Sequence, residues 1–402
     1  MTAINKTQNT FWVNQPIFNE SKTMIFSRPI QEKLANQPVD FGSTYIVSKL
    51  DINNDQQLGE VIDFLNNNYY DKTIPMVKAN ETFNTKRYSL IFNKSLFKFI
   101  TGNNSTTICV RLAYNNILVG VISGYPQRYQ LKNKQQELID TTILCVDKRL
   151  RSKSITSKLL TEFRNQFTDG NLKSGIFNSN RNIPNPLCKI TTYQRPLTPD
   201  RLNEMGYFDI KDKSIIHKVI DKYTIIRKLP DNIKKATPSM FNKLHALYSE
   251  YMEKFDVHAI YTVDQLQTIL QNEIVSTYVI YDKKVPTGNR TDADIIDFFS
   301  FYNYNTQYDM SSDANIIKSA RLFIHTILSN DITTRRLTEY AAIAAHSELC
   351  NMFYITNTME LNEVLSDIDN HYSYDSDYYV NMYNWELPSM KPEQISRFVM
   401  VN

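Results

Sequence analysis

Cysteine, histidine and glycine are scarce in this chain of 402 residues, which has four, six and nine of them. The four cysteines lie far apart, mostly within apolar segments: Cys109, Cys145, Cys188 and Cys350. This spacing excludes a disulfide framework and paired metal-ligand motifs, and it is typical of a reduced, intracellular protein. The histidines form no short ligand pair, so we expect no bound metal ion.

Long apolar runs are missing as well. No segment approaches the roughly 20 consecutive apolar residues of a membrane-spanning helix. The first residues, Met1–Trp12, lack the apolar core of a signal peptide. We therefore expect a soluble, cytoplasmic protein without a transmembrane segment, and a monomer as the default state.

Several motifs that would indicate other enzyme classes are also absent. The sequence has no P-loop, no Rossmann fingerprint and no G-x-S-x-G elbow, which argues against kinases, dehydrogenases and serine hydrolases. The net charge of +3 is too small to favour nucleic acid as a partner, and the aromatic residues are spread over the whole length.

Hydrophobic residues make up 42% of the chain and charged residues 22%, which is ordinary for a globular protein with a large core. Prolines interrupt residues 1–40, so we expect an extended arm there. The pattern then predicts a helix over Gln56–Asn68, a hairpin over Thr107–Tyr125 that turns at Asn115 and Asn116, and a strand over Leu138–Val146.

The same order of elements returns in the second half. It predicts two helices and three strands: Ser239–Lys254 and Leu337–Leu349 as helices, and Val275–Tyr281, Ile295–Tyr304 and Asn351–Thr356 as strands. The repetition suggests an internal pseudo-repeat with its boundary near Lys222–Pro230. Because no low-complexity linker separates the halves, we expect two lobes that share one sheet, 41–225 and 226–402, preceded by an arm over 1–40.

The segment Thr141–Leu160 carries the most information, because a strand there runs through a basic turn directly into an amphipathic helix. Apolar residues recur every four positions: Ile155, Leu159, Phe163 and Phe167. Arg151, Ser152, Lys153 and Ser154 stand just before them, at the helix N-terminus, where free N–H groups and the helix dipole favour an anion such as phosphate. A solvated basic surface is the alternative reading of this turn.

Four widely separated blocks resemble the N-myristoyltransferase family. LCVDKRLRSK (Leu144–Lys153) is similar to the family's LCVHKKLRSK, whose turn holds the diphosphate of coenzyme A. FWVNQP (Phe11–Pro16) resembles FWxTQPV, IIDFFSFYNY (Ile295–Tyr304) resembles VTDFLSFYTL, and YNWELPSM (Tyr383–Met390) resembles YNWKCPSM. The order and spacing of these blocks agree with the family over almost the whole chain.

This resemblance implies an α/β fold of two pseudo-symmetric GNAT-type lobes that share a central mixed sheet flanked by helices. It also implies transfer of myristate from myristoyl-CoA to the α-amine of an N-terminal glycine in proteins or peptides. Myristoyl-CoA is then the acyl donor substrate, and no permanently bound cofactor is expected.

The resemblance further implies roles for particular residues. Backbone N–H groups of Ile143 and Leu144 would form the oxyanion hole next to Thr142, and the main-chain carboxylate of Asn402 would be the base. The residues around the acyl-CoA would be Phe11, Trp12, Leu144, Cys145, Val146, Arg151, Ser152, Lys153, Ser154, Ile155 and Thr156. The residues that face the peptide would be Tyr69, Asp71, Tyr88, Asn178, Tyr193 and Asp375.

The chain departs from the family pattern at several of these positions. Thr142 replaces an asparagine, and Ser154 replaces a basic residue. Asp71 is the one acid where the family has an acidic run, and Thr191–Gln194 replaces Arg-Tyr-Trp-His. These changes concern the peptide side more than the acyl-CoA side, so two alternatives stay open: a GNAT-type N-acetyltransferase with a shorter acyl-CoA, or a non-catalytic acyl-CoA or peptide-binding protein.

Overall fold

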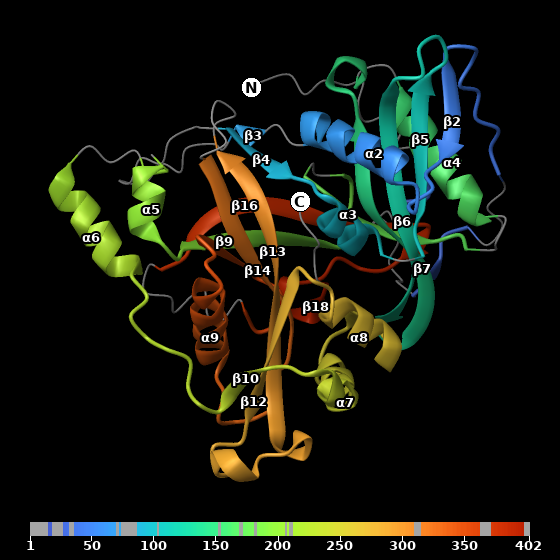
Figure 1. Cartoon of the computed structure of the whole chain (residues 1–402). Helices are drawn as coiled ribbons and strands as arrows, with labels where there is room; N and C mark the ends of the chain where they lie inside the picture. Colours follow the sequence, from blue (N-terminus) through green and yellow to red (C-terminus); the bar gives the residue numbers. More distant parts are fainter. Residues whose placement is uncertain are drawn as a thin grey trace.

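The computed structural model describes residues 15–17, 27–31, 36–69, 72–73, 87–102, 104–151, 154–168, 172–180, 183–205, 207–208, 212–308, 315–361 and 371–397. A large mixed sheet of 16 strands runs through the molecule, and helices cover its faces (Figure 1). The predicted fold class, two pseudo-symmetric lobes that share one mixed sheet, is confirmed.

The first half contributes eleven labelled elements. They are β2 (Tyr45–Lys49), α2 (Asp55–Asn68), β3 (Lys72–Thr73), β4 (Arg87–Ile91), α3 (Lys94–Thr101), β5 (Thr106–Leu112), β6 (Leu118–Leu131), β7 (Lys134–Val146), α4 (Ile155–Thr168), β8 (Gly175–Ser179) and β9 (Cys188–Pro196). Two helices, α5 (Pro199–Glu204) and α6 (Lys213–Tyr223), lead into the second half.

The second half repeats this order. Its elements are β10 (Ile233–Lys235), α7 (Phe241–Met252), β11 (Val257–Ala259), α8 (Val263–Leu270), β12 (Val275–Tyr281), β13 (Ile295–Tyr308), β14 (Ile316–His325), α9 (Thr334–Ser347), β15 (Met352–Thr356) and β16 (Ser373–Tyr383). Three short strands complete the fold: β1 (Arg28–Pro29), which pairs with β17 (Trp385–Glu386), and β18 (Ile395–Ser396), which pairs with β11.

Five pairs of corresponding elements in the two halves have equal lengths. The pairs β5 and β12 have 7 residues each, β6 and β13 have 14, α4 and α9 have 14, β8 and β15 have 5, and α3 and α8 have 8. In each half, one long strand is followed by a helix and a parallel neighbour: β7–α4–β8 and β14–α9–β15. The predicted internal repeat is therefore visible in the topology.

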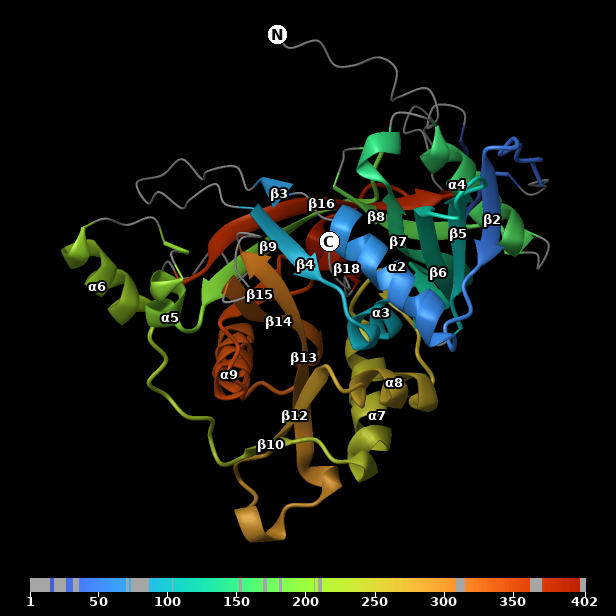
Figure 2. The same cartoon turned by 45° about the horizontal axis from the view of Figure 1, so that its top comes forward.

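The halves exchange their last strands. The sheet order is β14-β15-β9-β16-β8-β7 at its centre, so β9 of the first half pairs with β15, and β16 of the second half pairs with β8. Figure 2 shows β9 and β16 side by side between the two halves, as their pairing requires. This exchange joins the lobes through backbone hydrogen bonds rather than through a linker.

Helix α4 forms because its apolar stripe has a core to cover. Ile155, Leu159, Phe163 and Phe167 are all buried against β5, β6 and β7, as predicted from their spacing. Full burial of such a side chain contributes about 1.5–3 kcal/mol. On the second half, α9 packs its own apolar face onto β13 and β15 in a separate cluster.

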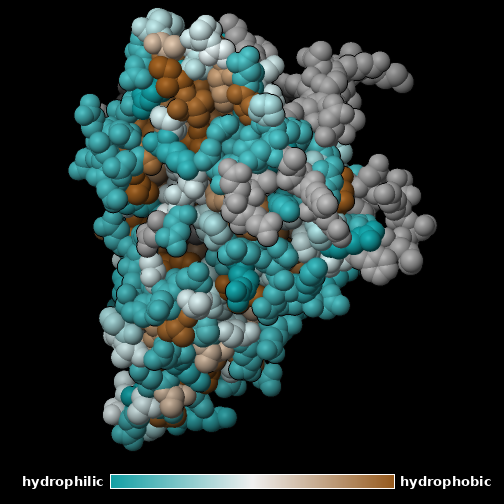
Figure 3. Space-filling view, turned by 90° about the vertical axis from the view of Figure 1, so that its right-hand side faces the viewer, coloured by the Kyte–Doolittle hydropathy of each residue, from teal (hydrophilic) through white to brown (hydrophobic). Residues whose placement is uncertain are grey.

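Other expectations for the elements also agree with the structure. The turn between β5 and β6 has Asn116 in the left-handed region at φ +59°, a conformation that asparagine tolerates. Ile46 of β2 and Ile117 are exposed apolar residues. Figure 3 shows apolar areas separated by hydrophilic residues on the face that it draws. Among the described residues, no helix is long and apolar enough to span a membrane.

Candidate active site

A β-bulge in β7 lies at the position predicted for the oxyanion hole. Ser123 of β6 pairs with Ile143 of β7, whereas Gly124 pairs with Thr141, so Thr142 is the extra residue. A Cβ atom at Gly124 would lie 2.5 Å from the carbonyl oxygen of Asp140. The bulge therefore requires glycine on the facing strand, because any side chain there would collide with the backbone.

Strands β7 and β8 separate just beyond this bulge. They pair in parallel only from Ile139 with Gly175 to Thr141 with Phe177, within the described part of the chain. A cavity of about 520 Å³ lies beside the separated strands. One edge of β7 therefore faces a ligand-sized space instead of a neighbouring strand.

The cavity brings together many of the residues that the sequence singles out. It is lined by nine of them: Tyr69, Thr142, Ile143, Leu144, Cys145, Val146, Arg151, Thr156 and Asn178. Leu144 is exposed to 37%, which is unusual for a leucine in a central strand and gives the cavity an apolar wall.

Two further predicted residues lie near the cavity without lining it. Ile155, the first residue of α4, is only 1% exposed, so its side chain belongs to the core between this helix and the sheet. Ser154 stands at φ +59°, and its carbonyl oxygen accepts hydrogen bonds from the Ser157 hydroxyl at 2.8 Å and the Lys158 N–H at 3.2 Å. Ser154 thus shapes the start of α4 through its backbone.

Two arginines of the basic turn after β7, Arg149 and Arg151, have different kinds of partner. Arg149 is paired with Asp147 at 2.7 Å, and its hydrogen bond lowers the pKa of the Asp147 carboxyl against the opposing effect of burial. The guanidinium of Arg151 instead donates to the carbonyl oxygens of Val146, at 3.2 Å, and of Asn68. These bonds hold Arg151 at the cavity wall, near the N-terminus of α4.

The remaining predicted residues stand elsewhere or are not described. Tyr193 of β9 packs against the apolar cluster under α9. Its neighbour Gln194 accepts a hydrogen bond from Tyr207, which belongs to the other large apolar cluster of the core, so Tyr193 faces away from that second cluster. Asp375 is the extra residue of a bulge in β16. The following lie outside the described residues: Phe11, Trp12, Asp71, Ser152, Lys153, Asn402 and the side chain of Tyr88.

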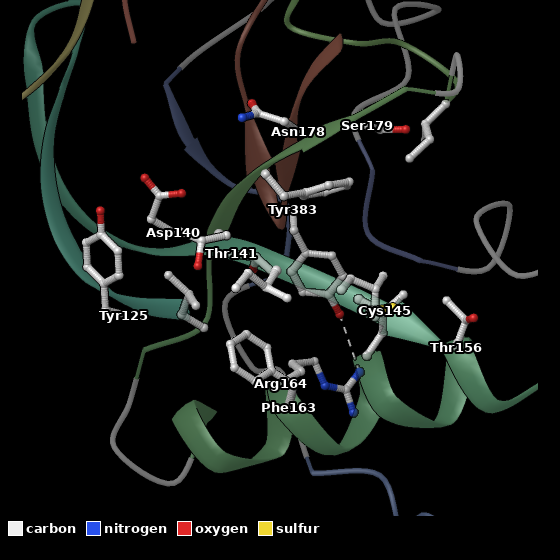
Figure 4. Close-up of a pocket in the computed structure, with 18 of the residues that line it drawn as sticks. Tyr125, Asp140, Thr141, Cys145, Thr156, Phe163, Arg164, Asn178, Ser179 and Tyr383 are labelled. Atoms are coloured by element: carbon white, nitrogen blue, oxygen red, sulfur yellow. Dashed lines mark hydrogen bonds between the residues drawn. The ribbon is translucent and has the colours of Figure 1, made fainter. Parts of the chain in front are cut away.

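The structure adds a buried arginine that sequence reasoning missed. Arg164 of α4 lines the cavity, donates from Nη1 to the hydroxyl of Tyr383 at 3.4 Å and from Nη2 to Oδ1 of Asn165 at 3.1 Å (Figure 4). Thr156, Leu160 and Arg164 follow each other at intervals of four, one position after the apolar stripe. Because residues four apart lie on one face of a helix, this spacing could have indicated from the sequence that Arg164 shares a face with the predicted site residue Thr156.

A second missed feature is a buried ion pair at the same cavity. Asp140 of β7 and Arg397, which follows β18, both line it, together with Tyr125 and Tyr129. Burial raises the pKa of both tyrosines well above the ordinary value, so they are neutral hydroxyl groups. The available signal was an arginine placed between apolar residues near the end of the chain.

Cys145 also lines the cavity, and its thiol is a weak nucleophile there. Burial raises its pKa to about 12, so the thiolate is rare at neutral pH. Among the described residues, no group of three or more His, Cys, Asp and Glu side chains could hold a metal ion. The described lining of the cavity offers backbone N–H groups, neutral tyrosine hydroxyls and the charges of Asp140 and Arg397.

Comparison with known proteins agrees with this architecture. The crystal structure of Saccharomyces cerevisiae N-myristoyltransferase with bound myristoyl-CoA superimposes with a TM-score of 0.81 at 19% sequence identity, over 96% of this chain and 94% of that one. This likeness shows the fold: the chain shares the architecture of that protein over almost its whole length.

The sequence comparisons are more specific. The family described as "Myristoyl-CoA:protein N-myristoyltransferase" matches with its N-terminal domain over residues 25–190 and with its C-terminal domain over 204–400. Relatives include the probable glycylpeptide N-tetradecanoyltransferase of Caenorhabditis elegans, 22% identical over 96% of this chain and 84% of the relative. The glycylpeptide N-tetradecanoyltransferase of Dictyostelium discoideum is 23% identical over 96% of this chain and 91% of its own length. The chain belongs to the N-myristoyltransferase family and is an acyltransferase.

Proposed function

We propose that this chain transfers the myristoyl group of myristoyl-CoA to the α-amine of an N-terminal glycine in protein substrates. The observation that carries this proposal is the cavity beside the bulge of β7. Its walls combine Ile143 and Leu144, the start of α4 with Arg151 and Thr156, and Arg397 near the end of the chain. A thioester donor and an amine acceptor need such a combination of anion site, oxyanion site and nearby base.

The diphosphate of the donor is assigned to the N-terminus of α4. Arg151 and Thr156 line the cavity there, and Ser152, Lys153, Ser154 and Ile155 complete the turn. Free N–H groups and the positive end of the helix dipole attract a diphosphate at such a position. Leu144, Cys145 and Val146 would then run along the rest of the donor, with Phe11 and Trp12 closing over it.

The thioester carbonyl is assigned to the edge of β7. Backbone N–H groups of Ile143 and Leu144 would donate to the oxygen as it becomes negative during attack, next to the bulged Thr142. One such donor typically contributes about 3 kcal/mol to transition-state stabilisation. The amine nitrogen forms a bond to the carbonyl carbon, and the carbon–sulfur bond breaks. The proton that the nitrogen then loses passes to the departing thiolate, so coenzyme A leaves as its thiol.

The acceptor amine must lose a proton before it attacks. An α-ammonium group has a pKa of about 7.7–8.0, so it is mostly protonated at neutral pH. We assign the base to the main-chain carboxylate of Asn402, which a short segment connects to the cavity-lining Arg397. General base catalysis of this kind contributes about 10²–10⁴-fold to the rate.

Fewer of the described residues support the proposed contacts with the acceptor peptide. Tyr69 and Asn178 line the cavity, which suits contact with the first residues of the acceptor. Asp71, Tyr88 and Asp375 would contact later residues, and Tyr193 would act from the α9 side of β9. We assign acyl-CoA binding to residues 41–225, with residues 1–40 as the arm and the terminal carboxylate in 226–402. The peptide groove, which the resemblance assigns to 226–402, would draw all of these six residues except Asp375 from 41–225.

Mass spectrometry tests this function directly. Peptides that begin Gly-x-x-x-Ser, and controls that begin with Ala, are incubated with the untagged chain and either myristoyl-CoA or acetyl-CoA. The proposal requires a myristoyl adduct on the glycine peptides alone. An acetyl adduct instead would indicate an N-acetyltransferase, and acyl-CoA binding without any adduct would indicate a binding protein; either result contradicts the proposal.

A further inference from the structure

Asp140 and Arg397 form a two-pronged ion pair at the wall of the cavity. Nη2 of Arg397 lies 2.7 Å from Oδ1 of Asp140, and Nη1 lies 2.9 Å from Oδ2. The side chain of Arg397 is 5% exposed and that of Asp140 is 8% exposed, so both charges are removed from water. Paired donation of this kind fixes the orientation of both groups as well as their distance.

Two further strands hold the same guanidinium. Nη1 of Arg397 also donates to the hydroxyl of Tyr129 on β6 at 2.7 Å, and that hydroxyl in turn donates to Asp140. Nε donates to Oδ1 of Asn178 on β8 at 3.2 Å. Arg397 is therefore tied to three adjacent strands of the first half, although it belongs to the last part of the second half.

The position of the pair relates two parts of the proposed site. Asp140 precedes Ile143 by three residues in β7, and Arg397 precedes Asn402 by five residues. Because an extended chain covers at most about 3.3–3.6 Å per residue, Asn402 can lie no farther than about 18 Å from Arg397. The strand before Arg397, β18, is only two residues long, so its pairing with β11 gives little additional anchorage.

Stability alone is a weak reason for such a pair. Burying two charges costs free energy that well-packed apolar residues would not cost, so apolar replacements are often neutral or stabilising. We propose that the Asp140–Arg397 pair is a positioning clasp: it sets where the chain beyond Arg397 begins relative to the oxyanion strand β7. This inference rests on the proposed function, in which the terminal carboxylate is the base.

Two variants separate positioning from folding. The double substitution Asp140→Leu with Arg397→Met removes both charges together, so neither is left buried alone. Arg397→Lys keeps the charge but loses the two-pronged geometry. The matched control is Arg111→Met, which breaks the ion pair between Arg111 and Glu60 on the same half, away from the cavity lining.

The expected result is a slower transfer step with intact donor binding. In single-turnover experiments at pH 6.5, both clasp variants should transfer about 10–100-fold more slowly. This is less than the roughly 10²–10⁴-fold expected when a general base is lost, because the base is displaced and not removed. Their dissociation constants for myristoyl-CoA should stay within about two-fold of the unmodified chain. The control variant should keep its transfer rate.

The pH dependence distinguishes a displaced base from a general loss of structure. At pH 9 most of the acceptor amine is already unprotonated, because its pKa is about 7.7–8.0, so a base is needed less. The defect of the clasp variants should therefore shrink to less than about three-fold at pH 9. A defect that is equal at both pH values, or no defect at all, would overturn the positioning role.

Hydrogen exchange gives a readout that needs no activity. Without substrates, amide exchange in peptides that contain Ile395 and Ser396 should be about ten-fold faster in the clasp variants than in the unmodified chain and the control. Unchanged exchange overturns the clasp even if transfer is slower in the variants. If the unmodified chain makes no product with either donor, the proposed function fails, and the exchange result still decides whether the pair anchors this segment.

Discussion

The turn that follows β7 and the turn that follows β14 occupy equivalent places in the two halves of the molecule. Each has eight residues, 147–154 and 326–333, and each leads into a helix of 14 residues. Each leaves its strand in the same way: the N–H of Asp147 donates to Val119 at 2.9 Å, and that of Thr326 donates to Phe298 at 3.0 Å. Their chemistry is nevertheless opposite.

The second turn is closed by an acid of its own lobe. The buried carboxylate of Asp297 accepts hydrogen bonds from the N–H groups of Leu328 at 2.8 Å and Ser329 at 3.0 Å, and from the Thr326 hydroxyl at 2.9 Å. The residue equivalent to Asp297 in the first half is Leu118, which is apolar and buried. The second turn thus carries its own anion.

The first turn carries cations and a cavity instead. Arg149 is paired with Asp147, and Arg151 lines the cavity at the start of α4. The same supersecondary frame therefore encloses an acid in the second half, where Asp297 stands, and borders a cavity in the first half, where Leu118 stands. The turn at 326–333 has no basic residue, so we expect only the first half to hold the donor.

The largest loss of transfer rate should follow removal of Val401 and Asn402, because this deletion takes away the proposed base and leaves the first turn intact. The shortened chain should transfer about 10²–10⁴-fold more slowly. Rapid-quench kinetics with saturating donor and peptide measure this rate, and calorimetry checks that myristoyl-CoA still binds. Normal turnover after the deletion would remove the carboxylate from the mechanism.

Asp297→Asn probes the closed turn. Burial raises the pKa of Asp297 to about 6, more than its hydrogen bonds to Leu328, Ser329 and Thr326 lower it. The ordinary unfolded value is about 3.9. The folded state therefore holds the proton more tightly, and the stability contributed by Asp297 is highest below about pH 4 and falls as the pH rises to about 6.

The expected size follows from this difference in pKa. The gap in unfolding free energy between the unmodified chain and Asp297→Asn should change by about 2 kcal/mol between pH 4 and pH 7, in favour of the variant at higher pH. Urea unfolding at several pH values measures it. A gap that does not vary with pH would show that folding leaves the pKa of Asp297 at its ordinary value.

Gly124→Ala tests the bulge of β7, beside which the cavity lies. The added Cβ would lie 2.5 Å from the Asp140 carbonyl oxygen and 3.0 Å from the Phe163 ring, so we expect a loss of about 1–3 kcal/mol in stability. The matched control is Gly59→Ala in α2, where nothing lies within 4 Å and a gain of about 0.5–1 kcal/mol is expected. Thermal unfolding compares the two, and equal behaviour would contradict the role of the bulge.

Local patterns made much of the fold predictable. The four-residue spacing of Ile155, Leu159, Phe163 and Phe167 placed α4, and the pair Asn115-Asn116 placed the hairpin turn. The repeated order of elements indicated the two halves. These features depend on neighbours in the sequence, which is why the sequence carries them openly.

Features that join distant parts of the chain were not predicted. The exchange of β9 and β16 between the halves depends on pairings far apart in sequence, and the Asp140–Arg397 pair joins residues 257 positions apart. Helix α3 was missed because eight residues give little periodicity. The resemblance to a family supplied most of the candidate residues, and the cavity then grouped nine of them.

Affinity for the donor tests the contrast between the two turns most directly. Calorimetric titration with myristoyl-CoA compares the unmodified chain, Arg151→Ala with Lys153→Ala, and Arg335→Ala with Arg336→Ala in the first turn of α9. The account predicts binding weakened by about ten-fold or more in the first pair of substitutions, through lost phosphate contacts, and unchanged in the second. Equal affinity in all three chains, or weakening only in the second pair, would contradict it.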